Sequence, residues 1–441
     1  MRLAKKLSSR FRKLYRNVFI NIPVFLAVLF LNNLTKNKKV RLRCLGNIEN
    51  RKNILLIRHD AIGDYILFRN FIKVLRDSKK YGDYKITLVG NDAWREIAER
   101  LDGGHVGEFI WLDKAAFKSS ASYRYKKLKE IASKDYETVI HPFSNNFFNA
   151  DNDITILTWA RKKIGRAINP ERARTLKLRL INFLLGFIYK ELIYDEAKPI
   201  FEFYSNQRFF GELLGEKAGI RRPLIGLNPA ISAENIILEK NLKDSRGNDA
   251  SALIAGDYAL LFIGASVKHR KWPVENFAEA GRYLTERYGF GIVLCGGESE
   301  EEEAAKFAER WEAAGGSENR AVYVDLVGKI SLYELLYVVK GAKIVVSNES
   351  MLPHIAVAVD GPAVFVISGG EDCYGHFVPY PEDITKKYFV VFHPTIEKDM
   401  ESYKKRSDYY GYGHGYDMSL DLSEITTKDV TDRLDSYLKN G

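Results

Sequence analysis

Residues 258–298, YALLFIGASVKHRKWPVENFAEAGRYLTERYGFGIVLCGGE, decide the fold of this chain. Two short apolar runs, 258–263 and 291–295, have the length of buried strands. They flank residues 274–288, where apolar and polar side chains alternate with a helical period. A strand, a crossover helix and a second strand in this order form a parallel βαβ unit. The segment therefore predicts a parallel α/β domain.

The same alternation of apolar runs and amphipathic runs continues in both directions. After residue 298 we expect helices at 299–313, 331–340, 351–359 and 427–438, and strands at 322–326, 342–347 and 363–367. Before residue 258 we expect strands at 53–59, 85–90, 109–112 and 137–142, and helices at 62–76 and 93–101. Residues 150–220 read as helical and strongly basic, and we take them as the edge of the first domain. The pattern predicts two doubly wound domains, 49–220 and 221–441, facing a central cleft.

Composition excludes several classes of protein. The 441 residues are 46% hydrophobic and 28% charged, which suits two well-cored domains and is too apolar for a disordered chain. Three cysteines, Cys44, Cys295 and Cys373, lie far apart and show no paired spacing. This argues against a disulfide framework or a cysteine-built zinc site, and it suits a reducing compartment.

The net charge of +10 is concentrated at the N-terminus. Residues 1–48 contain 12 of the 67 Lys and Arg residues and no Asp or Glu, so 55 basic residues face all 57 acidic ones in the remainder. The body of the protein is therefore close to neutral. A nucleic-acid-binding protein is the alternative that a basic chain suggests, but a reading motif of interleaved aromatic and basic residues is not evident. We expect no nucleic-acid partner.

The N-terminal segment, residues 1–48, is predicted to associate with a membrane. Its first part repeats apolar residues at helical spacing between basic ones: Leu3, Leu7, Phe11, Leu14 and Val18. Residues 18–31 are apolar but shorter than a spanning helix and are followed by more basic residues. We expect a peripheral or monotopic anchor formed by residues 1–45, on the inner face of a bacterial inner membrane. A cleaved signal peptide and a basic arm packed on the body are the alternatives.

The motif RHDAIGD, residues 58–64, follows the first predicted strand. Gly63 permits a tight turn into the helix, and Asp64 falls in the first helical turn, where the helix dipole favours an ionised carboxylate. Asp64 is thus a candidate general base for an acceptor hydroxyl, or a helix cap. Asp60 is the rival base, or a structural residue of the turn.

Two further motifs follow strands of the second domain. In residues 264–273, GASVKHRKWP, a turn of small residues precedes several basic ones, and Ser266, Lys268 and Arg270 are candidate contacts to a diphosphate. A solvated basic loop is the alternative. Gly296 and Gly297 precede Glu298, a candidate acceptor of hydrogen bonds from a ribose or base, although such a sequence also makes an ordinary turn.

The fourth motif is VVSNESMLPH, residues 345–354, where a strand leads into a helix. The first amides of a helix are unpaired and attract phosphate groups. Glu349, Ser350 and Met351 stand at this position, and His354 follows one turn later as a ligand contact or a core residue. On the first domain, basic residues from 161 to 179 include Arg161 and Lys163, which we treat as candidate contacts to an anionic acceptor.

The order of these motifs resembles glycosyltransferase family 9, the ADP-heptose:lipopolysaccharide heptosyltransferases. The resemblance covers residues 53–438 and is carried by IRHDAIGD (57–64), GASVKHRKWPVENF (264–277), LCGGE (294–298), VGKISLYEL (327–335), VVSNESMLPH (345–354) and SGGED (368–372). It implies a GT-B fold and an inverting transferase without a metal or other cofactor. The implied donor is a nucleotide sugar, ADP-heptose, and the implied acceptor is a lipid-linked glycan such as lipopolysaccharide core.

The resemblance also implies roles for single residues. Asp64 matches the family's proposed base, Arg270 a lysine that contacts the donor phosphate, and Glu298 a glutamate that binds the donor. His354 matches a histidine near the pyrophosphate. Glu349 and Met351 depart from the family's usual aspartate and glycine at the helix start. These departures leave two alternatives open: a transferase with a different nucleotide sugar, and a catalytically degenerate GT-B scaffold protein in glycan assembly.

Overall fold

The computed structural model describes residues 52–143, 150–173, 176–313, 321–370, 374–410 and 420–439. The predicted membrane-associating segment, residues 1–48, lies outside these ranges. The chain divides into two compact units. The first holds the described residues up to Tyr65 with 71–197 and 205–219, and the second holds 66–70, 198–204 and the described residues from Ile220 onward.

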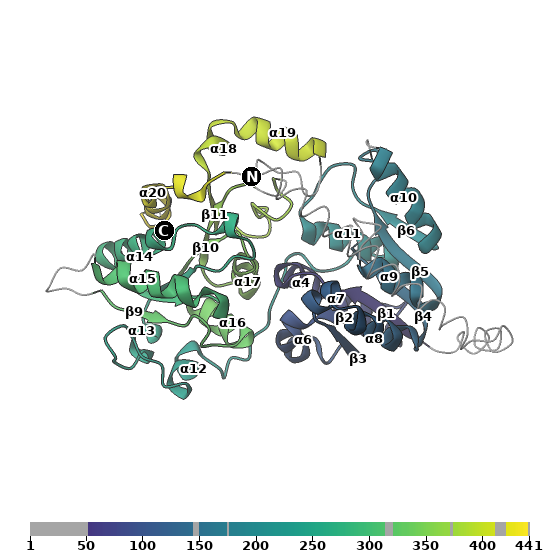
Figure 1. Ribbon diagram of the computed structural model, residues 1–441, viewed down its shortest axis with the longest axis horizontal. Coiled ribbons are helices and arrows are strands. Elements are labelled where there is room, and N and C mark those ends of the chain that lie inside the picture. The colour runs from purple at the N-terminus through teal and green to yellow at the C-terminus, as the bar shows by residue number, and fades with distance from the viewer. Residues whose placement is uncertain are drawn as a thin grey trace. The chain divides into compact units, whose positions relative to one another are not determined.

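The first unit is built on a six-stranded parallel sheet (Figure 1). Its strands are β1 (Asn53–Arg58), β2 (Lys85–Asn91), β3 (Glu108–Leu112), β4 (Asp135–His141), β5 (Trp159–Ala167) and β6 (Glu191–Tyr194), in the order β3-β2-β1-β4-β5-β6. The central strands are nearly continuous apolar runs because helices cover both faces of a parallel sheet. The direction of strand succession reverses between β1 and β4.

Eight α-helices connect or flank these strands in the described part of the first unit and its boundary. They are α4 (Ile62–Phe68), α5 (Asn70–Asp77), α6 (Arg95–Asp102), α7 (Lys114–Ser119), α8 (Ala121–Ala132), α9 (Ala150–Leu157), α10 (Leu176–Ile188) and α11 (Glu202–Leu214). Leu55 and Val139 of the sheet pack against Phe117 and Leu128 of α7 and α8. Asp113 begins α7 by accepting hydrogen bonds from the amides of Ala115 and Ala116.

The expectation that residues 150–220 are helical was wrong in part, because β5 and β6 lie within them. Some of the basic residues in this stretch form ion pairs within the sheet. Lys162 forms an ion pair with Glu191, and the buried Arg166 forms one with Asp195. Ile164 of the same strand is fully buried. Neutralisation by acidic partners on and just after β6 therefore allows a basic sequence to form an inner strand.

The second unit contains another six-stranded parallel sheet. Its strands are β7 (Tyr258–Phe262), β8 (Gly291–Cys295), β9 (Tyr323–Asp325), β10 (Ile344–Asn348), β11 (Ala363–Ser368) and β12 (Tyr388–Phe392), in the order β12-β11-β10-β7-β8-β9. Counted within each unit, both sheets have the strand order 3-2-1-4-5-6 of a doubly wound fold. The reversal here lies between β7 and β10.

The helices of the second unit are α12 (Ala233–Glu239), α13 (Ser251–Ala255), α14 (Val274–Tyr288), α15 (Glu301–Ala313), α16 (Leu332–Gly341), α17 (Leu352–Val359), α18 (Pro394–Lys398), α19 (Met400–Tyr410) and α20 (Thr427–Leu438). Side chains of α14, α15 and α20 form one core with alternate residues of the sheet, such as Leu261 and Leu294. Figure 1 shows α14 and α15 side by side on this face. Ser331 and Glu334 begin α16 with a reciprocal capping box.

Both expected α/β units are therefore confirmed. Within the residues that the structure describes, none of the helices has the length and apolar character needed to cross a membrane.

Candidate functional site

Three of the sequence motifs lie in loops at one edge of the second sheet. Residues 264–273 follow β7, residues 296–299 follow β8, and residues 349–351 follow β10. These strands are adjacent and parallel, so their carboxyl ends meet at the same edge. Two of the loops flank the reversal point between β7 and β10, where doubly wound sheets bind ligands. The fold thus brings the predicted donor residues together at this edge.

Asn348 connects the two loops at the reversal point. Its side chain is fully buried at the end of β10. Its Nδ2 donates to the Ile263 carbonyl oxygen at 2.9 Å, and its Oδ1 accepts from the Trp272 amide at 2.9 Å. Both ends of the loop after β7 are therefore fixed to one side chain. Sequence reasoning assigned Asn348 no role, although a lone amide side chain ending a buried apolar strand was the available signal.

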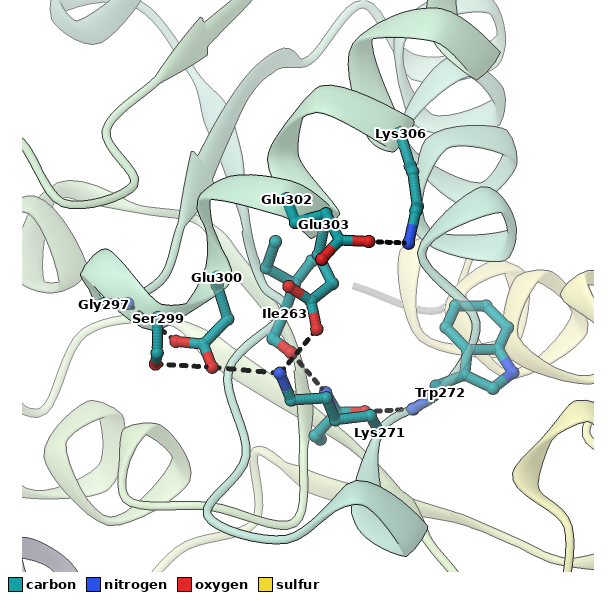
Figure 2. Close-up of polar contacts among 10 residues, drawn as sticks. Ile263, Lys271, Trp272, Gly297, Ser299, Glu300, Glu302, Glu303 and Lys306 are labelled. Atoms are coloured by element: carbon teal, nitrogen blue, oxygen red, sulfur yellow. Dashed lines mark hydrogen bonds and ion pairs between the residues drawn. The ribbon is translucent and has the colours of Figure 1, made fainter.

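Lys271 of the basic loop has a structural role. Figure 2 shows its ammonium group between two carboxylates, with Nζ 3.0 Å from Glu300 Oε1 and 2.7 Å from Glu303 Oε1. Burial lowers the pKa of Lys271, but hydrogen bonds to Glu303 and Glu300 outweigh it and the pKa is raised. Glu300 Oε2 also accepts from the Gly297 amide at 3.0 Å. This network ties the loop after β7 to the loop after β8.

The remaining predicted residues of these two loops face solvent or lie near it. Ser266, Lys268 and Glu298 are exposed, and Arg270 is half-buried. A cationic loop and a carboxylate thus stand on neighbouring strand ends, which suits a ligand that carries both phosphate and hydroxyl groups. The individual donor contacts of these four residues stay predictions.

The start of α17 contains the two departures from the family pattern. Glu349 is buried, and its Oε2 accepts a hydrogen bond from Ser368 Oγ at 2.6 Å. Ser350 Oγ lies 3.3 Å from Ser347 Oγ. Met351 has φ −70° and ψ −30°, which any L-residue adopts. The backbone at this position therefore does not require glycine, and methionine is accommodated here without backbone strain.

His354 is a neutral residue inside α17. It is buried, and its Nδ1 lies 2.8 Å from the hydroxyl of Tyr380. Burial, and then the charge of His376, lowers the pKa of His354 to about 4. At neutral pH the imidazole can take part in hydrogen bonds but adds no positive charge to a diphosphate site. Among the predicted donor contacts, Lys268 and Arg270 are the residues that bring positive charge.

Asp64 lies in the first turn of α4, after β1 and beside the reversal point of the first sheet. Its Oδ2 accepts a hydrogen bond from the Ala61 amide at 3.1 Å. A hydrogen bond of this kind favours the ionised carboxylate. The capping interaction is therefore present, and Asp64 is half-buried at the carboxyl edge of the sheet.

Asp60 is held in the turn by several contacts. Its Oδ2 lies 2.7 Å from Nε of Arg58, whose side chain is fully buried. Its carbonyl oxygen accepts from Asn91 Nδ2 at 2.8 Å and from Trp94 Nε1 at 3.2 Å. This arrangement favours the structural alternative for Asp60 over an acceptor-side role.

Arg161 and Lys163 occupy alternate positions of β5 and so share one side of the strand. Arg161 is exposed and lies 3.9 Å from Glu137 Oε1. Lys163 donates to the Ile156 carbonyl oxygen at 3.3 Å. Burial lowers the pKa of Lys163 to about 8. The ammonium form of Lys163 still dominates at neutral pH, and an anionic partner would favour it further. This is compatible with the predicted acceptor contact but does not establish it.

The similarity to known proteins includes the same three loops. Residues 222–368 match the model of glycosyltransferase family 9 (heptosyltransferase). The resemblance to glycosyltransferase family 9 is therefore confirmed over these residues. This chain is 34% identical to lipopolysaccharide heptosyltransferase 1 of Escherichia coli over 113 residues, which is 25% of its length. Over 95 residues, 22% of the chain, it is 30% identical to lipopolysaccharide heptosyltransferase 2 of Salmonella typhimurium.

These alignments span 32% and 26% of the two relatives' lengths. The likeness to solved structures is more extensive. A family 9 glycosyltransferase of Veillonella parvula superimposes with a TM-score of 0.60 and 18% identity, covering 88% of this chain and 97% of that one. An E. coli heptosyltransferase solved with ADP-2-deoxy-2-fluoro heptose gives a TM-score of 0.57 and 19% identity, covering 87% and 99%. The two units thus form an α/β fold of the GT-B kind.

Proposed function

We propose that this protein is a glycosyltransferase that moves heptose from ADP-heptose to a lipid-linked glycan acceptor such as lipopolysaccharide core. The observation that carries the proposal is the family 9 match over residues 222–368, which include the loops after β7, β8 and β10. Lipopolysaccharide heptosyltransferases are among the relatives that this chain matches.

The proposed reaction is a direct displacement that inverts the anomeric carbon. Asp64 takes the proton of the acceptor hydroxyl, and the hydroxyl oxygen attacks the sugar carbon while its bond to the diphosphate breaks. Arg270 and Lys268, with the backbone amides at the helix start around Ser350, stabilise the departing diphosphate. We propose that these cations and amides neutralise the leaving group without a metal or another cofactor.

An Asp64→Asn variant tests the base assignment. Asparagine keeps an oxygen that can accept from the Ala61 amide, so the cap is retained while the proton acceptor is lost. We expect the transfer rate to fall by about 10²–10⁴-fold with little change in thermal stability. Asp113→Asn, at the capping residue of α7, is the matched control and should keep its rate. A wild-type transfer rate in the Asp64→Asn variant would refute the assignment of Asp64 as the base.

We further propose that residues 1–45 hold the protein at the cytoplasmic face of the inner membrane. The support is the sequence alone: 12 basic residues and no acidic residue in 1–48, with apolar residues at helical spacing. Deletion of residues 1–45 should move the protein from the membrane fraction toward the soluble fraction. An unchanged membrane fraction after the deletion would argue against this anchor.

The departures at Glu349 and Met351 favour one other candidate, a transferase that uses a different nucleotide sugar. Glu349 is one methylene longer than the usual aspartate and is already bonded to Ser368 Oγ. Selective binding of UDP, GDP or CMP over ADP would favour this candidate.

A further inference from the structure

Helix α10 presents an apolar surface to solvent. Four side chains on it, spaced four, three and four residues apart, are exposed by 53% to 84%: Leu176, Leu180, Phe183 and Phe187. Such spacing places them along one face of a helix. They make up half of the large exposed hydrophobic side chains found among the described residues. We call this face the α10 stripe.

The opposite face of α10 already accounts for its attachment to the first unit. Ile181 and Leu185 are buried, and they pack with Ala167 of β5 and with Tyr189. Figure 1 shows α10 beside β5 and β6 at the edge of the sheet. A helix with apolar side chains on two opposite faces normally buries both of them. The α10 stripe is therefore exposed to solvent, although apolar side chains of this kind are normally buried.

The basic residues in and around α10 indicate what the α10 stripe contacts. Residues 172–190 contain five basic residues, Arg172, Arg174, Lys177, Arg179 and Lys190, and no acidic residue. Arg179 and Lys190 are exposed at either end of the helix. Apolar leucine and phenylalanine side chains bordered by cations are typical of helices that lie in the interface of an anionic bilayer. At 13 residues, α10 is too short to span a bilayer.

We propose that α10 is a membrane-docking helix, which inserts the α10 stripe among the acyl chains of an anionic phospholipid surface while its basic residues contact the headgroups. This surface lies in the first unit and is separate from the predicted anchor in residues 1–45. The proposal does not depend on the transfer reaction. It predicts that the unit carrying Asp64 makes its own contact with the bilayer.

Gly186 provides a matched set of variants in the full-length chain. It is exposed, and a β-carbon added there meets no heavy atom within 4 Å, so larger side chains fit without disturbing the fold. It lies three residues after Phe183 and so neighbours that side chain of the α10 stripe on the helix surface. In sedimentation with phosphatidylglycerol/phosphatidylcholine vesicles, we expect Gly186→Glu to partition at least about tenfold more weakly than Gly186→Lys, with Gly186→Ala between them. Equal partition of the three variants would overturn the proposal.

A second measurement identifies what contacts the α10 stripe. In full-length Phe187→Trp protein, brominated lipids in the same vesicles should quench the new tryptophan relative to wild type. Leu238→Trp, on α12 of the second unit and 48% exposed before substitution, is the control and should not be quenched. If the chain binds vesicles but the tryptophan at 187 is not quenched, another segment of this chain or a second copy covers the stripe, and the proposal fails. Failure of the full-length chain to bind vesicles would also refute it. A wild-type transfer rate in either case would leave the proposed function standing.

Discussion

Asn348→Leu tests directly whether the Asn348 side chain holds the loop after β7 in place. The amide of Asn348 satisfies two backbone groups, the Ile263 carbonyl and the Trp272 amide, each at 2.9 Å. Leucine has a similar volume but no polar atom, so both groups stay buried without this partner. A buried polar group that loses its partner costs about 1–3 kcal/mol. We therefore expect the free energy of unfolding of the second unit to fall by roughly 2–5 kcal/mol.

Urea unfolding followed by tryptophan fluorescence measures this effect, because Trp272 and Trp311 are buried in the core of that unit. Asn235→Leu, the same change at an exposed position of α12, is the control and should alter the free energy by less than about 0.5 kcal/mol. We also expect ADP to bind the Asn348 variant more weakly, since the loop after β7 loses its fixed ends. If Asn348→Leu unfolded like the control, the side chain would not be what holds the loops.

Three further predictions concern ionisable side chains that are buried or half-buried. Burial lowers the pKa of His354 from 6.5 to about 4, so between these values the unfolded chain binds a proton that the folded chain does not. Stability should therefore fall as the pH drops from 7 to 4, by up to about 3 kcal/mol, and His354→Asn, measured by urea unfolding at several pH values, should lose this part of the dependence. Asp60→Asn leaves the buried Arg58 without its ion-pair carboxylate and should destabilise the protein by about 3 kcal/mol or more, whereas an acceptor-side role alone would raise KM at unchanged stability. Lys271→Met removes the cation between Glu300 and Glu303 and should cost about 1–3 kcal/mol in thermal unfolding, and an unchanged melting temperature would show that the network contributes nothing.

The sequence predicted the elements whose local pattern agrees with their final environment. The amphipathic run 274–288 became α14, and the apolar run 291–295 became β8, with the same bounds. Helix 427–438 likewise became α20, begun by a capping box at Thr426. These segments carry their own periodicity and end signals, so tertiary contacts did not have to override them.

The errors arose where long-range pairing decides the structure. The strand β5 was not predicted, because its cations are neutralised by acidic partners about 29 residues later in the chain. A local sequence pattern does not show such a pairing. Lys271 belongs to the basic run that suggested a phosphate site, but Glu300 and Glu303 already form ion pairs with it. Asn348 shows the same limitation, since both of its backbone partners lie more than 70 residues away. Motif order predicted which loops form the candidate site, but not which of their side chains hold the loops and which remain for a ligand.

Calorimetric titration of the full-length protein with ADP, UDP, GDP, CMP and ADP-heptose tests directly whether the chain has a donor site for ADP-heptose. We expect ADP to bind in preference to the other nucleotides and ADP-heptose to bind more tightly than ADP. Arg270→Ala should weaken ADP binding by roughly tenfold or more, because a charge-assisted hydrogen bond to phosphate is lost. Failure of all five ligands to bind would contradict the account and favour a scaffold protein that has kept the GT-B fold without its donor site.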